Sequence, residues 1–343
     1  MTRILTSLSL LALLAACGDG QPFFDNTDLD NQDAEIADNA DDTIGDGGDI
    51  DADSLLAGTD SPTDSGAIFR YETNKDNGGG LVTDVSYDAG TDTFTVDNIG
   101  FDGANVYQRG AAVDSLGVYA VFDANQTEAD FLTGNPVGQI VPYRAVVGTS
   151  VNTVDAAPRT TFALVRTGGY VSYGFGGYVY ERAGGVTLPT SGQATFAGEY
   201  GGVRTFAKQS GLRFVTGDMT LAIDFDDFNA NNAIRGRVEN RVVFFEDGSV
   251  DSAANNSDIG WIIVEGTDTL TSNGEIVSEV FTTRTGDSGQ LETYFEGTFN
   301  GIIAGDTLSA GDGGEIVGII NMIAEDEDLE ISIQETGGAI LYR

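Results

Sequence analysis

Residues 194–200 read Ala-Thr-Phe-Ala-Gly-Glu-Tyr, and this alternation of apolar with polar or small side chains decides the fold. A period of two places every second side chain on one face of a strand. Similar runs recur along the chain between turn signals rich in Gly, Asn and Asp. They span residues 93–96, 117–122, 161–166, 219–225, 238–245 and 329–333, with turns at 88–90, 247–248, 272–274 and 287–289. Such spacing predicts an all-β protein of antiparallel strands.

The folded part divides into two units. Residues 136–158 show the least periodicity, and a second break, Gly184-Gly185 with residues 189–192, precedes the most regular strand pattern. We predict an N-terminal antiparallel β domain at residues 66–185 and a C-terminal eight-stranded antiparallel β-barrel at residues 186–343. The run at residues 339–343 should close the barrel against the strand that starts near Ala194. Because closure removes sheet edges, we expect this barrel to fold by itself.

The first sixteen residues have the layout of a secretory signal peptide. Arg3 is followed by an apolar run at residues 4–14, and two alanines then precede Cys17. The run is too short for a membrane-spanning helix, which needs about 20 residues. Leu14-Ala15-Ala16-Cys17 resembles the lipobox of bacterial lipoproteins, in which the thiol receives lipid before cleavage on its amino side. The resemblance implies residues 1–16 as signal peptide, a covalent lipid (palmitate) on Cys17, anchoring in the bilayer, and, because Gly18 follows, the outer membrane.

Residues 17–65 are predicted to form a disordered acidic tether after the lipidated cysteine. Between residues 19 and 65 there are fifteen Asp and Glu and no Lys or Arg, so little apolar surface can offset the entropy of ordering. Asp49, Asp51 and Asp53 alternate as in a calcium loop. That motif lacks the glycine at its sixth position and the glutamate at its twelfth, so we favour a solvated tether.

The charge and the cysteine count restrict the partners. The formal net charge is −38, and −23 remains without the acids of the tether, which argues against nucleic acid and anionic lipid surfaces as ligands. Cys17 is the only cysteine, so an internal disulfide cannot form and stability must come from a packed core.

Two further segments carry a resemblance to a known family. Residues 188–200, Leu-Pro-Thr-Ser-Gly-Gln-Ala-Thr-Phe-Ala-Gly-Glu-Tyr, look like the opening of the C-terminal barrel in the transferrin-binding-protein-B-like lipoproteins. Residues 294–301, Tyr-Phe-Glu-Gly-Thr-Phe-Asn-Gly, followed by Gly-Gly-Glu-Ile-Val-Gly-Ile-Ile at 313–320, resemble that family's later strands. Ile319 departs from the pattern, in which a glycine or small residue is common.

The resemblance covers residues 188–343 and implies a non-catalytic protein of the envelope, surface-exposed or periplasmic. Members bind host or solute partners, such as transferrin and complement factor H, through variable loops. We therefore expect a protein or solute ligand at the barrel loops, but no contact motif can be placed on this sequence.

Several kinds of catalytic site are excluded by composition. Without histidine there is no Ser-His-Asp triad and no His-ligated metal, and lipidation of Cys17 removes thiol chemistry. Residues 174–177, Gly-Phe-Gly-Gly, are followed by a strand pattern instead of a phosphate-binding helix. We predict that the protein is not an enzyme, although paired carboxylates leave a hydrolase as the minor alternative.

Two local clusters offer sharper hypotheses. Asp227, Asn229 and Asn231 present oxygen atoms at alternate positions, as calcium prefers, but Asx-rich hairpin loops produce the same pattern for backbone reasons. We expect no cofactor beyond the lipid and keep calcium there as the weaker alternative. The aromatic residues at 170, 173, 175, 178 and 180 have mixed odd and even offsets, so we favour core packing over a displayed tyrosine patch.

Taken together, the sequence favours a lipid-anchored, non-catalytic binding lipoprotein of the bacterial envelope. The alternatives are a structural envelope lipoprotein without a specific ligand and, less favoured, a carboxylate-dependent hydrolase. Oligomeric state and ligand have no signal in the sequence.

The first prediction concerns the lipid anchor. Cys17→Ser should leave an unlipidated precursor, because a hydroxyl cannot replace the thiolate as acceptor of the lipid. We expect metabolic labelling with a fatty-acid probe to mark the wild-type protein and not the variant. A serine variant that still takes up the label would disprove the assignment.

Overall fold

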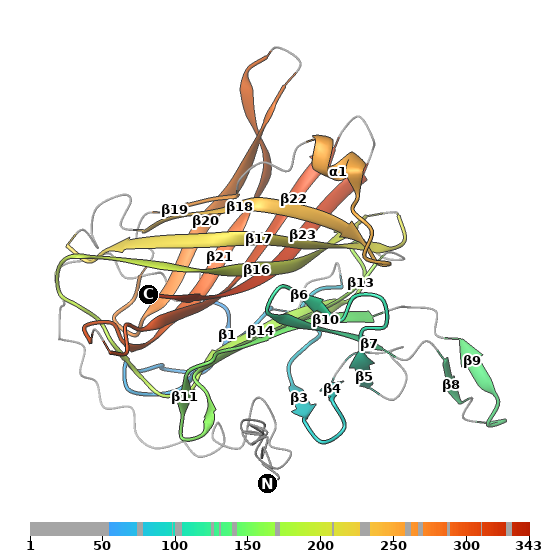
Figure 1. Ribbon diagram of the computed structural model, residues 1–343, viewed down its shortest axis with the longest axis horizontal. Helices are drawn as coiled ribbons and strands as arrows, with labels where there is room; N and C mark the ends of the chain where they lie inside the picture. The colour runs from blue at the N-terminus through green and yellow to red at the C-terminus, as the bar shows by residue number, and fades with distance from the viewer. Residues whose placement is uncertain are drawn as a thin grey trace, which may run out of the picture.

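The computed structural model describes much of the chain from Leu55 to Arg343. The described part consists of residues 55–343 apart from 74–77, 98, 100–104, 125–126, 130–131, 139–142, 169–171, 208, 227–233, 258–261, 267–269, 287–288, 310 and 327–330. Figure 1 shows two β units, a barrel coloured yellow to red and a curled sheet coloured blue to green.

The C-terminal unit is a closed eight-stranded antiparallel barrel, as predicted. Each strand pairs with the next along the chain, and the last pairs with the first. The strands are β16 (Gln193–Phe206), β17 (Leu212–Asp224), β18 (Ile234–Phe245), β19 (Ile262–Gly266), β20 (Glu275–Thr285), β21 (Leu291–Asp306), β22 (Glu315–Asp326) and β23 (Ile331–Tyr342). The short β15 (Val186–Thr187) adds in parallel to β21.

The prediction about the closing strand is confirmed. β23 pairs antiparallel with β16, from Ala197 opposite Tyr342 to Phe206 opposite Ile333. The strand is longer than its apolar end suggests, because a second run of the chain, Ile331 to Thr336, continues the same ladder.

The N-terminal unit is one curled antiparallel sheet, in the order β1-β2-β14-β13-β10-β7-β5-β4-β3, with β6 paired to β7. Its strands are β1 (Ala57–Gly58), β2 (Ile68–Tyr71), β3 (Val85–Asp88), β4 (Thr93–Val96), β5 (Val106–Arg109), β6 (Ser115–Leu116), β7 (Tyr119–Ala124), β10 (Tyr143–Thr149), β13 (Thr160–Thr167) and β14 (Gly176–Arg182). Two ribbons lie outside it, β8 (Thr127–Ala129) with β9 (Pro136–Gly138), and β11 (Thr153–Val154) with β12 (Ala157–Pro158).

The central strands of this sheet are buried on both faces. Every residue of β13 is buried, and so is every residue of β10 except Thr149. Residues 136–158, which show the least periodicity in the sequence, therefore include a central strand, because β10 pairs with both β13 and β7. A strand covered on both faces is continuously apolar and shows no alternation, so its pattern escapes a search for period two.

Alternate residues of these strands enter two different cores. Ala163 and Val165 join a core enclosed by the curl of the sheet, together with Phe94, Tyr107 and Phe122. Their neighbours on the strand face the barrel. There, side chains of the sheet and of the outer barrel wall form one cluster; it contains Ile68, Leu116, Tyr119, Val121, Val146, Phe162, Leu164, Tyr178, Tyr180, Val203, Leu212, Phe214, Ile302, Val317, Ile319 and Ile340.

This shared core argues against a barrel that folds by itself. Val203, Phe214 and Ile319 lie on the outside of the barrel and have at most 1% of their surface exposed, because the sheet covers them. An isolated barrel would present this apolar wall to water, which favours aggregation. We therefore expect the isolated barrel to aggregate despite the closure of its strands; independent folding itself stays a prediction without a test.

The interior of the barrel is mainly apolar. Glu335 is fully buried there; it accepts hydrogen bonds from the Tyr200 hydroxyl (2.9 Å) and from Arg204 Nε (2.6 Å), and pairs with Arg241. Burial alone would raise the pKa of this carboxyl, but the guanidinium groups of Arg241 and Arg204 outweigh it and hold the pKa below its usual value. Glu335 is therefore ionised at neutral pH.

Residues 55–65, assigned above to the tether, belong to the folded part. β1 pairs with β2, and the backbone oxygens of Thr63 and Gly66 accept hydrogen bonds from Arg182 at 3.0 and 2.9 Å. The oxygens of Leu56 and Thr59 accept from Arg70 Nη1. The local composition is polar, but its backbone carbonyls satisfy buried guanidinium groups, which a compositional argument does not detect.

One short helix is present among the described residues. α1 (Ser252–Ser257) follows β18, and Asp251 caps it, since its Oδ1 accepts a hydrogen bond from the backbone of Ala254 at 3.1 Å. No helix in the described part has the length and apolar composition needed to cross a membrane.

The docking of residues 55–65 leads to a second prediction, for truncated forms of the chain that begin at residue 18, 55 or 67. Starting at 67 removes four carbonyls that accept from Arg70 and Arg182, so the free energy of unfolding should fall by at least ~2 kcal/mol. Starting at 55 removes none of these contacts and should match the form that starts at 18. Urea unfolding followed by tryptophan and tyrosine fluorescence measures this. Equal midpoints for the forms beginning at 55 and 67 would show that the docked segment contributes nothing.

Candidate binding groove at the seam of sheet and barrel

The two β units meet along a seam, and Tyr119 of β7 lies at its centre. Its ring packs edge-on against Phe162, with ring centroids 4.9 Å apart. Its hydroxyl donates to the backbone oxygen of Glu199 (2.6 Å) and accepts from the backbone nitrogen of Ile340 (2.9 Å). Glu199 is on β16 and Ile340 on β23, so the sheet contributes a hydroxyl to the pair of strands that closes the barrel.

The close approach of Tyr119 and Phe162 requires glycine on the barrel. A Cβ atom at Gly201 would lie 2.7 Å from the Tyr119 ring, and one at Gly338 would lie 2.3 Å from Phe162. Both separations are shorter than van der Waals contact. Glycine at these two positions of β16 and β23 therefore lets the sheet pack against the closing strands.

Buried arginines of the sheet reach across the seam. Arg70 of β2 holds Glu275 of β20 through two hydrogen bonds of 2.6 and 3.1 Å, and both side chains are about 95% buried. Arg182 of β14 is fully buried and donates to the backbone oxygens of Asn273 and Ile303. Burial lowers the pKa of Arg182 to about 10, so its guanidinium stays charged at neutral pH.

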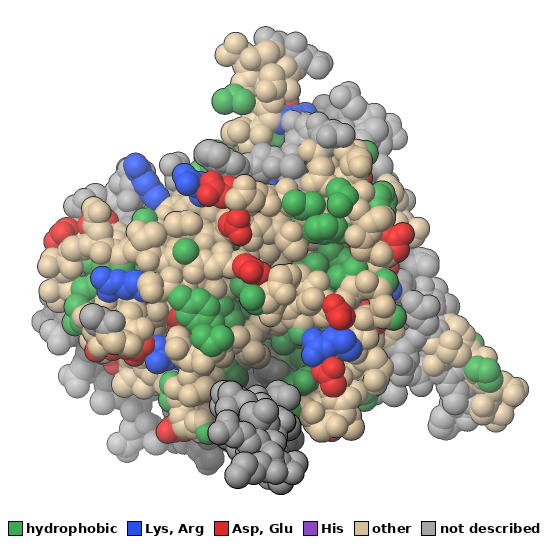
Figure 2. All heavy atoms as spheres, in the orientation of Figure 1, with side chains coloured by type: hydrophobic (Ala, Val, Ile, Leu, Met, Phe, Trp, Pro, Cys, Tyr) green, Lys and Arg blue, Asp and Glu red, His purple; other side chains and the backbone are tan. Residues whose placement is uncertain are grey.

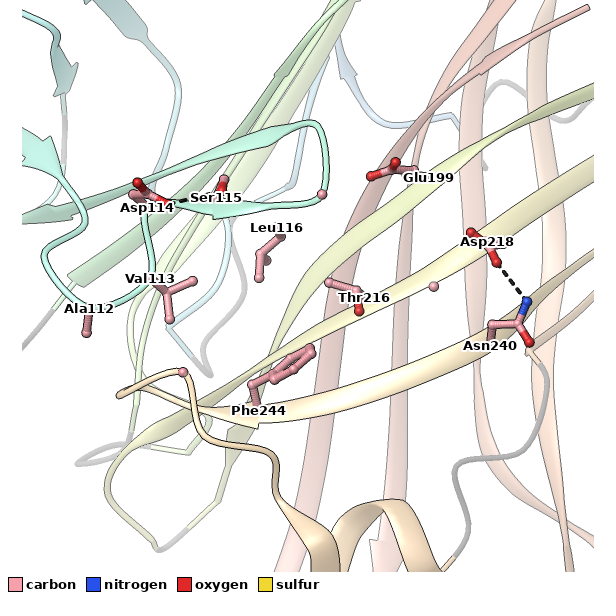
Figure 3. A pocket seen from close by; sticks show the side chains of 13 residues that line it. Ala112, Val113, Asp114, Ser115, Leu116, Glu199, Thr216, Asp218, Asn240 and Phe244 are labelled. Carbon is pink, nitrogen blue, oxygen red and sulfur yellow. Dashed lines mark hydrogen bonds between the residues drawn. The ribbon is translucent and has the colours of Figure 1, made fainter.

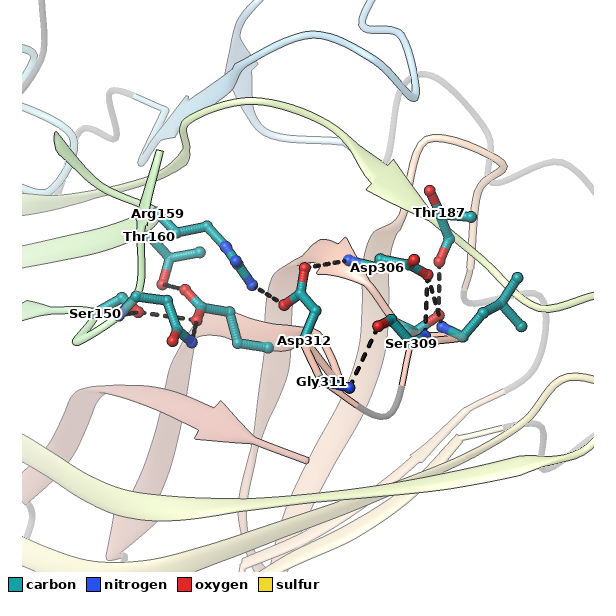
Figure 4. A network of polar contacts seen from close by, with 12 residues as sticks. Ser150, Arg159, Thr160, Thr187, Asp306, Ser309, Gly311 and Asp312 are labelled. Carbon is teal, nitrogen blue, oxygen red and sulfur yellow. Dashed lines mark hydrogen bonds and ion pairs between the residues drawn. The ribbon is translucent and has the colours of Figure 1, made fainter. Parts of the chain in front are cut away.

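A second polar cluster lies where the loop between β21 and β22 meets the sheet (Figure 4). Glu315, at the start of β22, is fully buried and accepts hydrogen bonds from Ser150 Oγ (2.9 Å), Thr160 Oγ1 (2.7 Å) and the side-chain amide of Asn152. Next to it Arg159 pairs with Asp312. These donors belong to the sheet unit and the carboxylates to the barrel unit.

At another point of the seam, too, the sheet supplies the arginine and the barrel supplies a carboxylate. Arg144 of β10 pairs with Glu246, which follows β18, at 3.3 Å, and with Asp123 of β7 at 3.0 Å. Burial raises the pKa of Asp123 and outweighs the opposite effect of Arg144. Along the seam, then, the sheet supplies the arginines and the barrel wall supplies most of the carboxylates.

Beside these contacts the seam opens into a groove of about 510 Å³ (Figure 3). One wall comes from the sheet, at residues 112–117 around β6, and the other from β16, β17, β18 and the turn that follows β18. The lining consists of Ala112, Val113, Asp114, Ser115, Leu116, Gly117, Glu199, Thr216, Gly217, Asp218, Asn240, Phe244 and Gly248.

A β-bulge shapes the barrel wall of the groove. The register between β17 and β18 shifts between Thr216 and Asp218, and Asn240 opposite has a left-handed backbone with φ of 53°. Gly217 is required at the shift, because a Cβ there would lie 2.7 Å from Val238 Cγ1. Bulges redirect side chains next to binding sites, and this one leaves Asp218 and Asn240 exposed at the groove.

Three carboxylates line the groove and each has one internal hydrogen bond. Glu199 Oε2 accepts from the backbone of Val118 at 2.8 Å, and Asp218 Oδ2 accepts from Asn240 Nδ2 at 2.7 Å. Asp114 Oδ1 accepts from Ser115 Oγ at 3.1 Å. Within the described residues none of the three pairs with a cation, and no lining residue is basic.

The outer surface is of mixed polarity. On the face in Figure 2, apolar side chains form small patches separated by polar surface, and several basic side chains lie against acidic ones. Val118 and Val250, 72% and 51% exposed, are close in sequence to the groove residues Gly117 and Gly248. They add apolar surface next to the two walls.

The positions singled out in the sequence have different outcomes. Cys17 and the candidate calcium ligands Asp227, Asn229 and Asn231 lie outside the described residues, so both remain predictions. In the part of the chain that is described, no group of three His, Cys, Asp or Glu is placed to hold a metal ion. Tyr178 and Tyr180 are 2% and 3% exposed in the shared core, which confirms core packing for these two aromatic residues.

Sequence reasoning missed the groove and the seam. Glu199, Asp218 and Phe244, which line the groove, belong to no recognisable sequence motif. The ligand expected at the barrel loops remains a prediction. One signal was available: only two of the sixteen basic residues are lysines, and Arg144, Arg166 and Arg182 interrupt apolar runs. Arginine is preferred over lysine in buried ion pairs.

Comparison with known proteins gives structural matches only. No family model and no curated protein matches the chain. A double mutant of the vaccine antigen transferrin-binding protein B (TbpB) from Haemophilus parasuis is 9% identical over 76% of this chain and 42% of its own, with a TM-score of 0.37. A single mutant of that antigen is 10% identical (81% and 59%, TM-score 0.31), and intact Ap-TbpB, with its N and C lobes, is 12% identical (81% and 59%, TM-score 0.32).

These structures are of the family that the two sequence motifs resemble. The chain spans 42–59% of their length, and at TM-scores below 0.5 the likeness carries no argument about a ligand. The assignment of an eight-stranded barrel preceded by a β unit rests on the strand order described above.

The seam yields a third prediction. Glu275→Gln keeps the shape of the side chain but leaves Arg70 buried without its counter-charge, which should cost about 3–5 kcal/mol of unfolding free energy. The matched control is Glu292→Gln, which breaks the half-exposed pair with Arg284 and should cost about 0–1 kcal/mol. Urea denaturation of both variants provides the comparison. Equal losses would mean that burial of the Arg70–Glu275 pair has no special weight.

Proposed function

We propose that this chain is a lipid-anchored, non-catalytic binding lipoprotein of a bacterial envelope, held in the outer membrane by acyl chains on Cys17. The sheet and the barrel, joined along the seam, would hold a partner at the membrane surface. The observation that carries the binding role is the groove at the seam, a concave site of about 510 Å³ built from both units.

The seam supports this role because it fixes the two walls of the groove relative to each other. Tyr119 joins the sheet to β16 and β23, and the Arg70–Glu275 pair joins it to β20. A preformed site loses less conformational entropy when a partner binds than a site that must first be ordered. The lipobox supports the anchor, and the acidic segment after Cys17 supports a spacer between membrane and folded part.

The alternatives predict different outcomes in one set of assays. A structural envelope lipoprotein would bind no soluble partner saturably. A carboxylate-dependent hydrolase would release sugars from a glycan mixture. The binding protein proposed here should bind a soluble partner saturably and should release no sugars from the glycan mixture.

A capture experiment provides the fourth prediction. The mature chain, immobilised through its N-terminal end, should retain a soluble partner from the surroundings of the bacterium in a saturable manner, while a panel of glycans stays intact. Proteinase K added to intact cells tells which partners are relevant, since a surface-exposed chain is degraded and a periplasmic chain is protected. Absence of saturable capture, or hydrolysis of any glycan, would contradict the proposal.

A further inference from the structure

The groove at the seam combines an apolar floor with carboxylates that pair with no cation among the described residues. Its floor is apolar, with Val113 and Leu116 on the sheet side and Phe244 on the barrel side (Figure 3). Around this floor stand Asp114, Glu199 and Asp218, and each has a carboxylate oxygen that accepts no hydrogen bond from the described residues.

From this arrangement we propose that the groove is the docking site for a basic segment of a partner protein, in which arginine or lysine alternates with apolar side chains. The inference rests on the binding role proposed above and names the surface and the class of partner. Apolar side chains would cover Phe244 and Val113, while the cations pair with Glu199, Asp218 and Asp114.

The openness of the groove favours a chain segment over a small molecule. Asp114, Ser115 and Gly117 on one wall are exposed, and so are Asp218, Asn240 and Gly248 on the other. Small-molecule sites surround most of the ligand surface, which a groove with exposed walls cannot do. A segment that remains attached to a larger protein needs to bury only one side.

The negative charge of this chain argues against two other occupants of the groove, its own acidic N-terminal segment and a second copy of the chain. The segment of this chain that precedes the described residues is acidic, with thirteen Asp and Glu and no Lys or Arg between residues 19 and 54, so it would be repelled by the three carboxylates. A second copy of the chain carries the same net charge of −38. A basic partner is attracted by the groove and by the field of the whole molecule, which speeds association.

The cations near the groove are already engaged. Arg144 pairs with Glu246 and Asp123, and Arg213 pairs with Asp251 at 2.9 Å. Arg241, on the same strand as Asn240, is directed into the barrel, where it pairs with Glu335. Within the described residues the groove carboxylates thus have no internal cation that a ligand would need to displace.

Fluorescence anisotropy with a labelled peptide of three Arg-Leu repeats tests the proposal on the mature full-length chain in non-ionic detergent. The double variant Glu199→Gln with Asp218→Asn keeps both internal acceptor oxygens and removes two charges, and should weaken binding about tenfold. The matched control, Glu279→Gln with Glu296→Gln, removes two exposed charges from β20 and β21 and should weaken it less than about twofold. Ser115→Trp, which fills the groove without a change in charge, should weaken it about as much as the first variant.

Three results would overturn the proposal: no binding of the Arg-Leu peptide by the wild type at low salt, equal weakening by the groove and control pairs, or equally tight binding of an Arg-Ser peptide. No binding would show that the groove is not a site for basic segments. Equal weakening would show that the net charge of the protein alone attracts the peptide, and equally tight binding of the Arg-Ser peptide would show that the apolar floor is not used. A partner captured as described above with the same affinity by the wild type and the groove variant would leave the binding role intact and place it on another surface. Absence of capture by the wild type would count against the binding role itself.

Discussion

The structure depends on a sheet that is buried on both faces. One face of the curled sheet encloses its own core, and the other lies on the outer wall of the barrel, so neither unit is complete without the other. Phe162 and Ala163 are neighbours in the chain and belong to different cores. Because the barrel wall and the sheet share apolar surface, the position of one is set by the other. The packing of the sheet on the barrel wall therefore determines the shape of the groove.

The distribution of charge follows from the same packing. The sheet contributes Arg70, Arg144 and Arg159 to the seam, and the barrel contributes Glu275, Glu246 and Asp312. A buried ion pair is weak evidence for added stability, because desolvation offsets much of the attraction, but it does penalise every arrangement that separates the partners. These pairs therefore specify how the two units dock more than they strengthen the docking. Because each pair removes one arginine and one carboxylate from the surface, the excess of acidic groups stays on the exterior.

The barrel could be predicted from the sequence because its strands have one face in the core and one outside. The alternation at residues 194–200 marks β16, and the apolar run that ends at Tyr342 marks the strand that closes the ladder. The sheet was harder, since β10 has no polar face to give a period, and the polar residues 55–65 are held by contacts of their backbone carbonyls. The groove could not be predicted: Ser115 and Glu199 are 84 positions apart, and only the docking of the sheet brings their strands together. Arginines within apolar runs were the one indication of ion pairs at long range.

The shortage of accessible basic residues has a consequence for limited proteolysis. Trypsin cleaves after lysine or arginine and needs an extended, exposed segment of about eight residues around the bond. Arg70, Arg166, Arg182 and Arg204 are at least 94% buried within strands, so in the described part the folded chain offers trypsin few cleavable bonds. Each of those bonds becomes available when the sheet separates from the barrel or the barrel opens. Tryptic cleavage of this protein would therefore report the opening of its fold rather than the exposure of its surface, whereas proteases that cleave after acidic residues would report the surface.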